Sequence, residues 1–146
     1  EIFEEKSISL KSLGLEQIKE KVTFMQGDAC NLKDIYTCFD LIFCSNLIDR
    51  LYYPQKFLDD IPSRINKDGL LVLLSPYTWL EDYTPKENWL GGYIKDNKEV
   101  KTLDTLKENL LVDFELLETI DVPFVIKETS RKYQHTISQM SIWKKK

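Results

Sequence analysis

The chain has 146 residues, of which 42% are hydrophobic and 12% aromatic, and its formal net charge is −4. This length and composition are typical of one globular domain and exclude a disordered tail. The acidic balance provides no basic field for nucleic acid, and no apolar run reaches the roughly 18 residues of a membrane span. Because no basic-then-apolar leader opens the sequence, we expect a cytoplasmic protein.

The first expected element is a short amphipathic helix over residues 9–21, in which apolar residues recur at helical spacing although Gly14 weakens the pattern. Residues 22–26 then resemble a strand that stops at Gly27-Asp28. A second strand is expected at Phe39–Cys44, where the segment is apolar and rich in β-formers.

A helix is expected to begin at Pro54, because proline is favoured in the first turn. Its apolar face would carry Phe57, Leu58, Ile61 and Ile65, and Pro62 would kink it or mark its last turn. After Gly69, the run Leu70–Leu74 is typical of a strand buried on both faces.

Strand, crossover, strand, helix and strand form the repeated βαβ pattern of a doubly wound sheet, so three parallel strands are predicted. A further helix is expected around residues 103–111, followed by an antiparallel strand pair at residues 114–120 and 136–143. We therefore predict a mostly parallel α/β sheet. The residues expected in its core are Leu41, Ile42, Leu71, Val72, Leu73, Phe114 and Ile142.

Three cysteines, Cys30, Cys38 and Cys44, lack paired CxxC spacing, which favours reduced thiols over disulfides. His135 is the only histidine, so we expect no metal site. A lone cysteine at a strand end has no assured base, and covalent catalysis by Cys44 or His135 is therefore disfavoured.

The segment of residues 75–92 follows the predicted buried strand and is rich in aromatic side chains. Ligands of open α/β sheets bind at the carboxyl ends of the strands, which places this aromatic loop where a small molecule would lie. The alternative is a packed loop that only covers the sheet. The sequence alone does not decide between a ligand-binding loop and a covering loop.

Asp28 and Ala29 directly after one strand, and Asn46 directly after the next, resemble the second half of a class I S-adenosylmethionine-dependent methyltransferase. The resemblance implies that Asp28 contacts the adenine amino group with the Ala29 amide nearby, and that Asn46 borders the methyl donor. The alternatives are a Gly-Asp turn and a helix cap.

Four motifs sharpen the resemblance, namely SNLIDRL at 45–51, SPYTWL at 75–80, WLGG at 89–92, and PF through RKYQ at 123–134. Together they resemble the carboxyl-terminal methyltransferase domain of ovothiol biosynthesis enzymes, from about residue 20 to the end. This resemblance implies methyl transfer from S-adenosylmethionine to a ring nitrogen of thiol-histidine.

One departure concerns the Gly-rich loop and the acidic ribose ligand of class I methyltransferases, which are both missing here. The first residue is Glu1 and not Met. We therefore expect residues 1–146 to form a single unit, the second half of a methyltransferase domain, lacking the first two strands and the Gly-rich loop. Such a fragment should bind cofactor weakly alone, and self-association or a partner chain should complete its sheet.

Methyl transfer to nitrogen requires alignment of a neutral imidazole and exclusion of water. A carboxylate that accepts the opposite ring N–H would fix the tautomer, and Asp82 and Glu87 are the catalytic candidates in the loop. Both are equally compatible with solvated charges.

Tyr77, Trp79 and Trp89 are the candidate walls for the imidazole, and Arg131 with Gln134 would hold the carboxylate of the substrate. Two other functions remain open: a non-catalytic binding or assembly module, and another Rossmann-like enzyme such as a nicotinamide dehydrogenase. The latter would require a Gly-x-Gly-x-x-Gly turn in the expected missing upstream segment.

Overall fold

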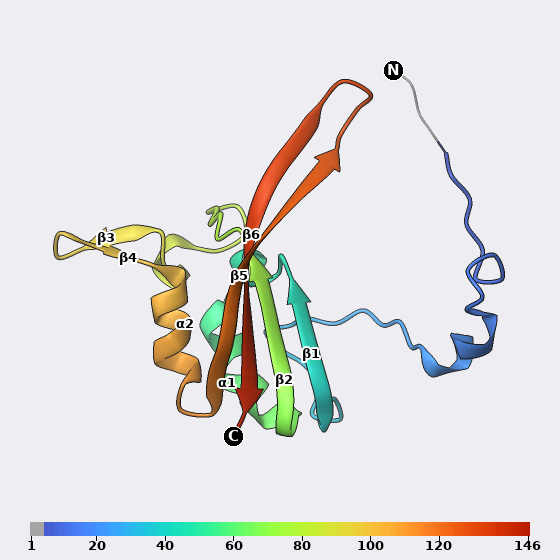
Figure 1. The fold of residues 1–146 in the computed structure, drawn as a ribbon. Coiled ribbons are helices and arrows are strands. Elements are labelled where there is room, and N and C mark those ends of the chain that lie inside the picture. Colours follow the sequence, from blue (N-terminus) through green and yellow to red (C-terminus); the bar gives the residue numbers. More distant parts are fainter. Residues whose placement is uncertain (1–4) are drawn as a thin grey trace.

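The computed structural model describes residues 5–146 and contains a four-stranded sheet with the strand order β1-β2-β6-β5 (Figure 1). The strands are β1 (Phe39–Ser45), β2 (Ile65–Ser75), β5 (Phe114–Lys127) and β6 (Tyr133–Lys145), and a separate ribbon pairs β3 (Tyr93–Lys95) with β4 (Lys98–Val100). The helices are α1 (Pro54–Asp60) and α2 (Thr102–Leu110), with 3-10 turns η1 (Glu16–Lys21), η2 (Ile48–Arg50), η3 (Ile61–Arg64) and η4 (Lys86–Asn88).

Strands β1 and β2 are parallel, whereas β2–β6 and β6–β5 are antiparallel. The α/β class and the antiparallel carboxyl-terminal pair are therefore confirmed. The expected majority of parallel strands is wrong, because the described residues contain a single parallel pair and β6 lies between β2 and β5.

Helix α1 begins at Pro54 as predicted, and it buries Phe57 and Leu58. It ends earlier than expected, because η3 takes over at Ile61 with Pro62 in its first turn, where a missing N–H costs no helical hydrogen bond. Ile65 is buried as the first residue of β2 and not as part of a helix.

The core lies between one face of the sheet and the two helices. Leu71, Leu73 and Trp143 from β2 and β6 pack with the buried faces of α1 and α2, and Trp143 has no exposed surface. Leu71, Val72, Leu73 and Phe114 are buried as predicted. Ile142 is only half-buried, because the side chains of β6 alternate and Trp143 occupies the helix-covered face.

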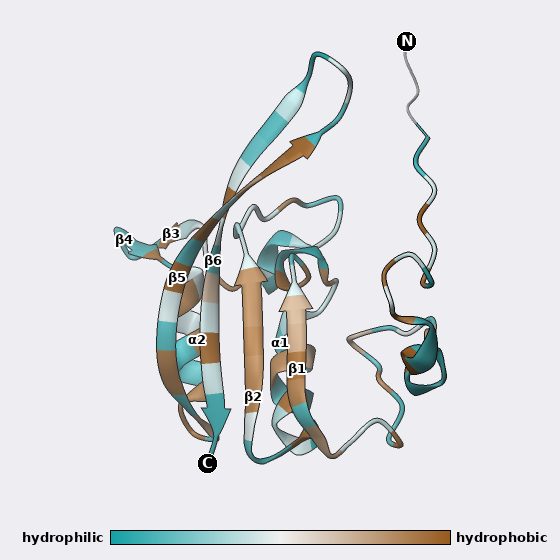
Figure 2. Ribbon diagram, turned by 45° about the vertical axis from the view of Figure 1, so that its right-hand side comes forward, coloured by the Kyte–Doolittle hydropathy of each residue, from teal (hydrophilic) through white to brown (hydrophobic). Residues whose placement is uncertain are grey.

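The opposite face of the sheet carries no helix in the described part of the chain, and both helices lie behind the strands in Figure 2. On this open face Leu41 and Phe43 are 55% and 58% exposed. The prediction that Leu41 is buried is therefore wrong, and Ile42 is only half-buried at the sheet edge. The apolar strands β1 and β2, brown in Figure 2, therefore also contribute to a sheet face that no described element covers.

The segment of residues 5–38 contains no strand, so the prediction of a strand at 22–26 is wrong. Phe24 is 93% exposed and nothing pairs with this backbone. The predicted helix at 9–21 shortens to η1, because Gly14 adopts a left-handed φ of 68° and no apolar surface receives the helix face. Arg64 fixes the end of this segment by donating to the carbonyl oxygens of Leu32, Lys33 and Tyr36.

Strands β5 and β6 are longer than the predicted 114–120 and 136–143, and together they project beyond the rest of the sheet as a long hairpin (Figure 1). Pro123 lies inside β5, opposite Ile137. It is tolerated there because β5 is an edge strand whose outer side makes no ladder hydrogen bonds.

Candidate functional site

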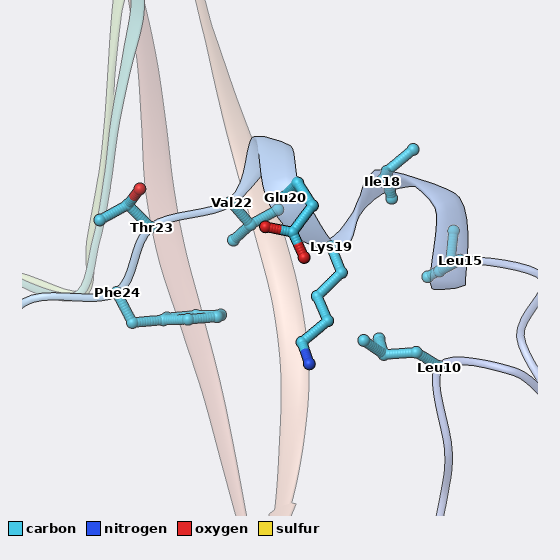
Figure 3. Close-up of a pocket in the computed structure, with 8 residues that line it drawn as sticks. All are labelled: Leu10, Leu15, Ile18, Lys19, Glu20, Val22, Thr23 and Phe24. Carbon is cyan, nitrogen blue, oxygen red and sulfur yellow. The ribbon is translucent and has the colours of Figure 1, made fainter.

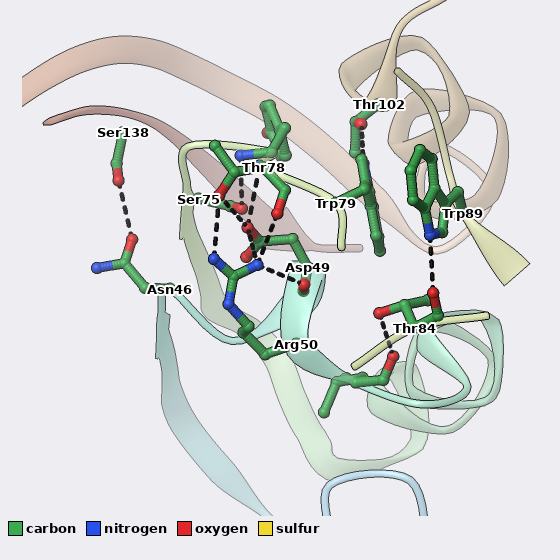
Figure 4. A network of polar contacts seen from close by, with 12 residues as sticks. Asn46, Asp49, Arg50, Ser75, Thr78, Trp79, Thr84, Trp89, Thr102 and Ser138 are labelled. Atoms are coloured by element: carbon green, nitrogen blue, oxygen red, sulfur yellow. Dashed lines mark hydrogen bonds and ion pairs between the residues drawn. The ribbon is translucent and has the colours of Figure 1, made fainter. Parts of the chain in front are cut away.

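The site forms where the parallel strands β1 and β2 end side by side. Asn46 follows β1 with a left-handed φ of 51°, and its backbone N–H donates to Leu74 O at 2.7 Å. Its side-chain Oδ1 accepts a hydrogen bond from Ser138 of β6 at 2.8 Å (Figure 4). The Asn46 side chain is thus held in place between two strands.

An ion pair between buried Asp49 and half-buried Arg50, both after β1, binds the loop after β2 (Figure 4). Asp49 is 1% exposed, and its Oδ2 accepts from Arg50 Nη1 at 2.9 Å and from the Thr78 backbone N–H at 3.1 Å. Arg50 in turn donates to Thr78 O at 2.7 Å and to Thr78 Oγ1 at 3.0 Å. The aromatic loop is therefore anchored to the end of β1 by both members of the pair.

Further contacts extend this anchorage along the aromatic loop. The Arg50 guanidinium lies 5.1 Å from the centroid of the Tyr83 ring. Thr84 donates to Leu51 O at 2.7 Å, and Asn88 donates to Tyr52 O at 3.0 Å. The two loops consequently form one structural unit at the carboxyl ends of β1 and β2.

Trp79 and Trp89 are internal parts of this unit. Trp79 is 6% exposed and donates its indole N–H to Thr102 Oγ1 at 3.0 Å, while Trp89 donates to Thr84 O at 2.8 Å. Their rings stack with centroids 6.5 Å apart. Trp79 therefore belongs to the packed core, and Trp89 is half-buried beside it.

Tyr77 has a left-handed φ of 52°, and its hydroxyl is buried without a hydrogen-bond partner. Burial raises the pKa of Tyr77 to about 12; the nearby Ser141 hydroxyl lowers it and the charge of Asp49 raises it. The Ser141 hydroxyl oxygen also accepts from the Trp143 indole N–H at 2.9 Å. Tyr77 thus remains a protonated phenol at neutral pH.

The other predicted substrate and catalytic residues lie further out. Asp82 and Glu87 belong to the aromatic loop, and both are exposed. Arg131 and Gln134 lie at the far end of the β5–β6 hairpin, also exposed. Since Tyr133 is five residues beyond Ser138, the turn lies about 16 Å along β6 from Asn46, at ~3.3 Å per residue.

Asp28 and Ala29 lie in the segment before β1. Asp28 is exposed, and its Oδ1 accepts from the Cys30 backbone N–H at 2.8 Å, which forms a local turn. Ala29 and Cys30 pack against the core. The structure does not bring Asp28 into contact with Asn46 or with the aromatic loop.

Sequence reasoning missed Asp49 and Arg50 as candidate site residues. They were part of the SNLIDRL motif, but a buried carboxylate and its partner cannot be told from surface charges by sequence spacing. An Asp-Arg dipeptide directly after a strand that ends at the ligand edge was the available signal.

A cavity of about 540 Å³ lies elsewhere, in the segment before β1 (Figure 3). Its lining is Leu10, Leu15, Ile18, Lys19, Glu20, Val22, Thr23 and Phe24. These side chains come from the η1 turn and its flanks, and the charged groups of Lys19 and Glu20 extend between Phe24 and Leu10 (Figure 3). This cavity of mixed polarity lies within one segment, remote from the ends of β1 and β2.

No helix among residues 5–146 is long and apolar enough to cross a membrane. Within the same residues no three His, Cys, Asp or Glu side chains gather as a metal site would require. Cys30, Cys38 and Cys44 are all free thiols, and burial raises the pKa of Cys44 to about 11.

The chain matches no protein-family model. It also matches none of the curated proteins. Among solved structures, one determined for the conversion of a disulfide bond into a thioacetal group during echinomycin biosynthesis aligns with a TM-score of 0.58 and 10% identity. TehB from Haemophilus influenzae aligns with a TM-score of 0.50 and 15% identity.

The two alignments include 92% and 94% of this chain. The chain spans only 62% and 48% of the lengths of those structures. At such low identity the likeness concerns the fold alone, and it supports a class I methyltransferase fold for this chain.

Proposed function

We propose that this chain takes part in methyl transfer from S-adenosylmethionine to a ring nitrogen of a thiol-histidine. The observation that carries the proposal is the Asp49–Arg50 anchorage, which fixes the aromatic loop beside Asn46 at the carboxyl ends of β1 and β2. In a methyltransferase-like fold, this edge of the sheet is the expected place for ligand. The resemblance of the anchored motifs to ovothiol methyltransferase domains supplies the acceptor.

The cofactor would be held by Asp28, Ala29 and Asn46, and it supplies an electrophilic methyl group when bound. These residues offer only some of their polar atoms to the cofactor, because others are already hydrogen-bonded within the chain. Asp28 Oδ1 is engaged in its turn, but the exposed carboxylate retains Oδ2 for an adenine amino group. Asn46 Oδ1 is engaged with Ser138, which leaves the amide N–H groups for a ligand.

The role of the chain's own residues is to align a neutral imidazole and to exclude water. The aromatic loop provides the enclosure, and Asp82 and Glu87 are the exposed carboxylates in it that can accept the ring N–H. The proposed contact between Arg131, with Gln134, and the acceptor carboxylate requires the β5–β6 hairpin to bend toward Asn46.

We further propose that the 146 residues supply the acceptor side of a larger methyltransferase unit. No strand among residues 5–146 pairs with the outer edge of β1, and the open face exposes Leu41 and Phe43. Additional polypeptide or a second copy would cover this edge and face. The isolated chain should accordingly bind S-adenosylmethionine weakly, because the polar contacts of a Gly-rich loop and an acidic ribose ligand are missing.

Calorimetry tests the cofactor part of the proposal in the full-length natural polypeptide that carries these residues. Asp28→Ala should weaken S-adenosylmethionine binding by about 1–2 kcal/mol, the scale of one charge-assisted hydrogen bond. Asp34→Ala is the matched control, since Asp34 is also exposed and lies in the same segment. Equal dissociation constants for both variants would remove Asp28 from the cofactor site.

The open sheet face favours one alternative, a non-catalytic binding or assembly module. This function would bring association with another chain without any affinity for S-adenosylmethionine. The same calorimetric titration of the full-length polypeptide therefore separates the two functions.

A further inference from the structure

Three buried side-chain polar atoms lack a hydrogen-bond partner within the described residues, and they gather around one point of the fold. They are Asp49 Oδ1, Tyr77 OH and Gln139 Oε1. Gln139 pairs with Ser75, the last residue of β2, and Tyr77 follows two residues later with its N–H donated to Ser75 Oγ. Asp49 is bonded to Thr78, the next residue.

Asp49 is the most constrained of the three groups. Its Oδ2 accepts from Arg50, from the Thr78 N–H and from Thr78 Oγ1, whereas Oδ1 accepts nothing. The side chain is 1% exposed, so bulk water does not satisfy this oxygen. A buried acceptor without a donor is destabilising, and such atoms in native proteins are usually matched by a ligand or an ordered water.

A cleft of about 430 Å³ lies against this region and is lined by Tyr77 and Gln139. The start of α2 and the β4 strand form its other side. The lining carries charges of both signs, because Lys101 lies between Glu99 and Asp104. Asp49 lies outside the lining but near enough to Tyr77 for its charge to raise the pKa of Tyr77. The unpartnered oxygens of Asp49 and Gln139 can only accept hydrogen bonds. A ligand that complements these oxygens must therefore donate hydrogen bonds, as a ring N–H group does.

We propose that Asp49, assisted by the Tyr77 hydroxyl, is the carboxylate that accepts the ring N–H of an imidazole-bearing acceptor. This inference rests on the proposed function, since it names the group that fixes the acceptor tautomer. Arg50 and Thr78 hold Oδ2, so that Oδ1 stays oriented while the opposite ring nitrogen keeps its lone pair for the methyl group. Asp49 takes this role because it is enclosed and held, whereas Asp82 and Glu87 are exposed to water.

The test uses the 146-residue chain without cofactor and three probes: L-histidine, imidazole and 1-methylimidazole. At about pH 8 the imidazole ring is neutral, and 1-methylimidazole has no ring N–H to donate. In an NMR titration, L-histidine and imidazole should bind and shift the amide signals of Tyr77 and Thr78. 1-Methylimidazole should bind at least tenfold more weakly. Equal affinity for imidazole and 1-methylimidazole, or no binding at millimolar concentration, would overturn the proposal and leave an enclosed water as the partner of Asp49.

Variants separate Asp49 from the exposed carboxylates. Asp49→Asn should abolish the preference for imidazole over 1-methylimidazole, while Asp34→Asn, an exposed aspartate remote from the cleft, should preserve it. Tyr77→Phe removes only the hydroxyl and keeps the ring, so it should weaken imidazole binding about three- to tenfold in a chain that still folds, as expected for one neutral hydrogen bond. A loss of the preference in Asp82→Asn or Glu87→Gln instead of Asp49→Asn would overturn the assignment.

The proposed function can fail separately from this inference. If imidazole binding depends on Asp49 but the full-length polypeptide transfers no methyl group, methyl transfer is refuted and the N–H site stands. If methyl transfer occurs and Asp49→Asn leaves imidazole binding unchanged, the N–H site is refuted alone.

Discussion

Gly91 is the position at which the packing of the aromatic loop can be tested most sharply. A Cβ at this residue would lie 2.7 Å from both Thr102 Cα and Thr102 Oγ1, and closer still to the Thr102 backbone nitrogen. Carbon atoms pack at about 3.5–4.0 Å, so the start of α2 would have to move by about 1 Å. Backbone cannot rotate aside as a side chain can.

We expect Gly91→Ala to lower the free energy of unfolding by about 3 kcal/mol, the upper part of the usual range for overpacking. The measurement is urea unfolding followed by tryptophan fluorescence, since Trp79 donates to Thr102 at the same contact. Gly92→Ala should cost about 1–2 kcal/mol, because Gly92 has a left-handed φ of 79°.

Gly27→Ala is the control for this series, since nothing lies within 4 Å of its Cβ position. It should leave stability unchanged or raise it by up to about 1 kcal/mol. If Gly91→Ala unfolds within about 0.5 kcal/mol of the wild type, the loop is not packed against α2 and the account of its anchorage is wrong.

Three further variants test the fold and its titration. Arg64→Ala should destabilise the chain by about 2–4 kcal/mol and speed proteolysis within residues 24–36, because Arg64 holds Asp60 and three carbonyl oxygens of that segment; unchanged cleavage would contradict this. Trp79→Phe should cost about 1–3 kcal/mol through lost volume and the lost bond to Thr102, and unaltered urea unfolding would place Trp79 outside the core. The raised pKa of the Cys44 thiol means that its contribution to stability is complete below pH 9.0 and is lost as pH rises toward about 11, by at most about 2–3 kcal/mol. Cys44→Ala should remove that part of the alkaline slope, and an identical slope would refute a buried neutral thiol.

The strands with strong apolar patterns could be predicted from the sequence because their partners lie inside the chain. β1 and β2 pair with each other, and the Leu70–Leu74 run is buried as its composition indicated. Residues 22–26 have a similar pattern, but they find no strand to pair with among the described residues. A pattern that fits a strand becomes one only when a neighbour satisfies its backbone groups.

The aromatic loop lies at the carboxyl ends of β1 and β2, as the sequence predicted, but the contacts of Asp49 and Arg50 that anchor it were not predicted. The position of the aromatic loop follows from the order of strand, loop and helix, which sequence contains. Burial of Trp79, exposure of Asp82 and the pairing of Asp49 with Arg50 depend on contacts between loops 28 residues apart in sequence, such as Arg50 with Thr78. Residue spacing carries no information about such contacts.

The most direct test of the proposed methyl transfer is mass spectrometry of thiol-histidine after incubation with the full-length polypeptide and S-adenosylmethionine carrying a deuterated methyl group. The proposal predicts a product heavier by one labelled methyl, with the label on a ring nitrogen, and an equal amount of S-adenosylhomocysteine. Bound S-adenosylmethionine with unmodified thiol-histidine, or the label on sulfur or on the α-amino group, would contradict it.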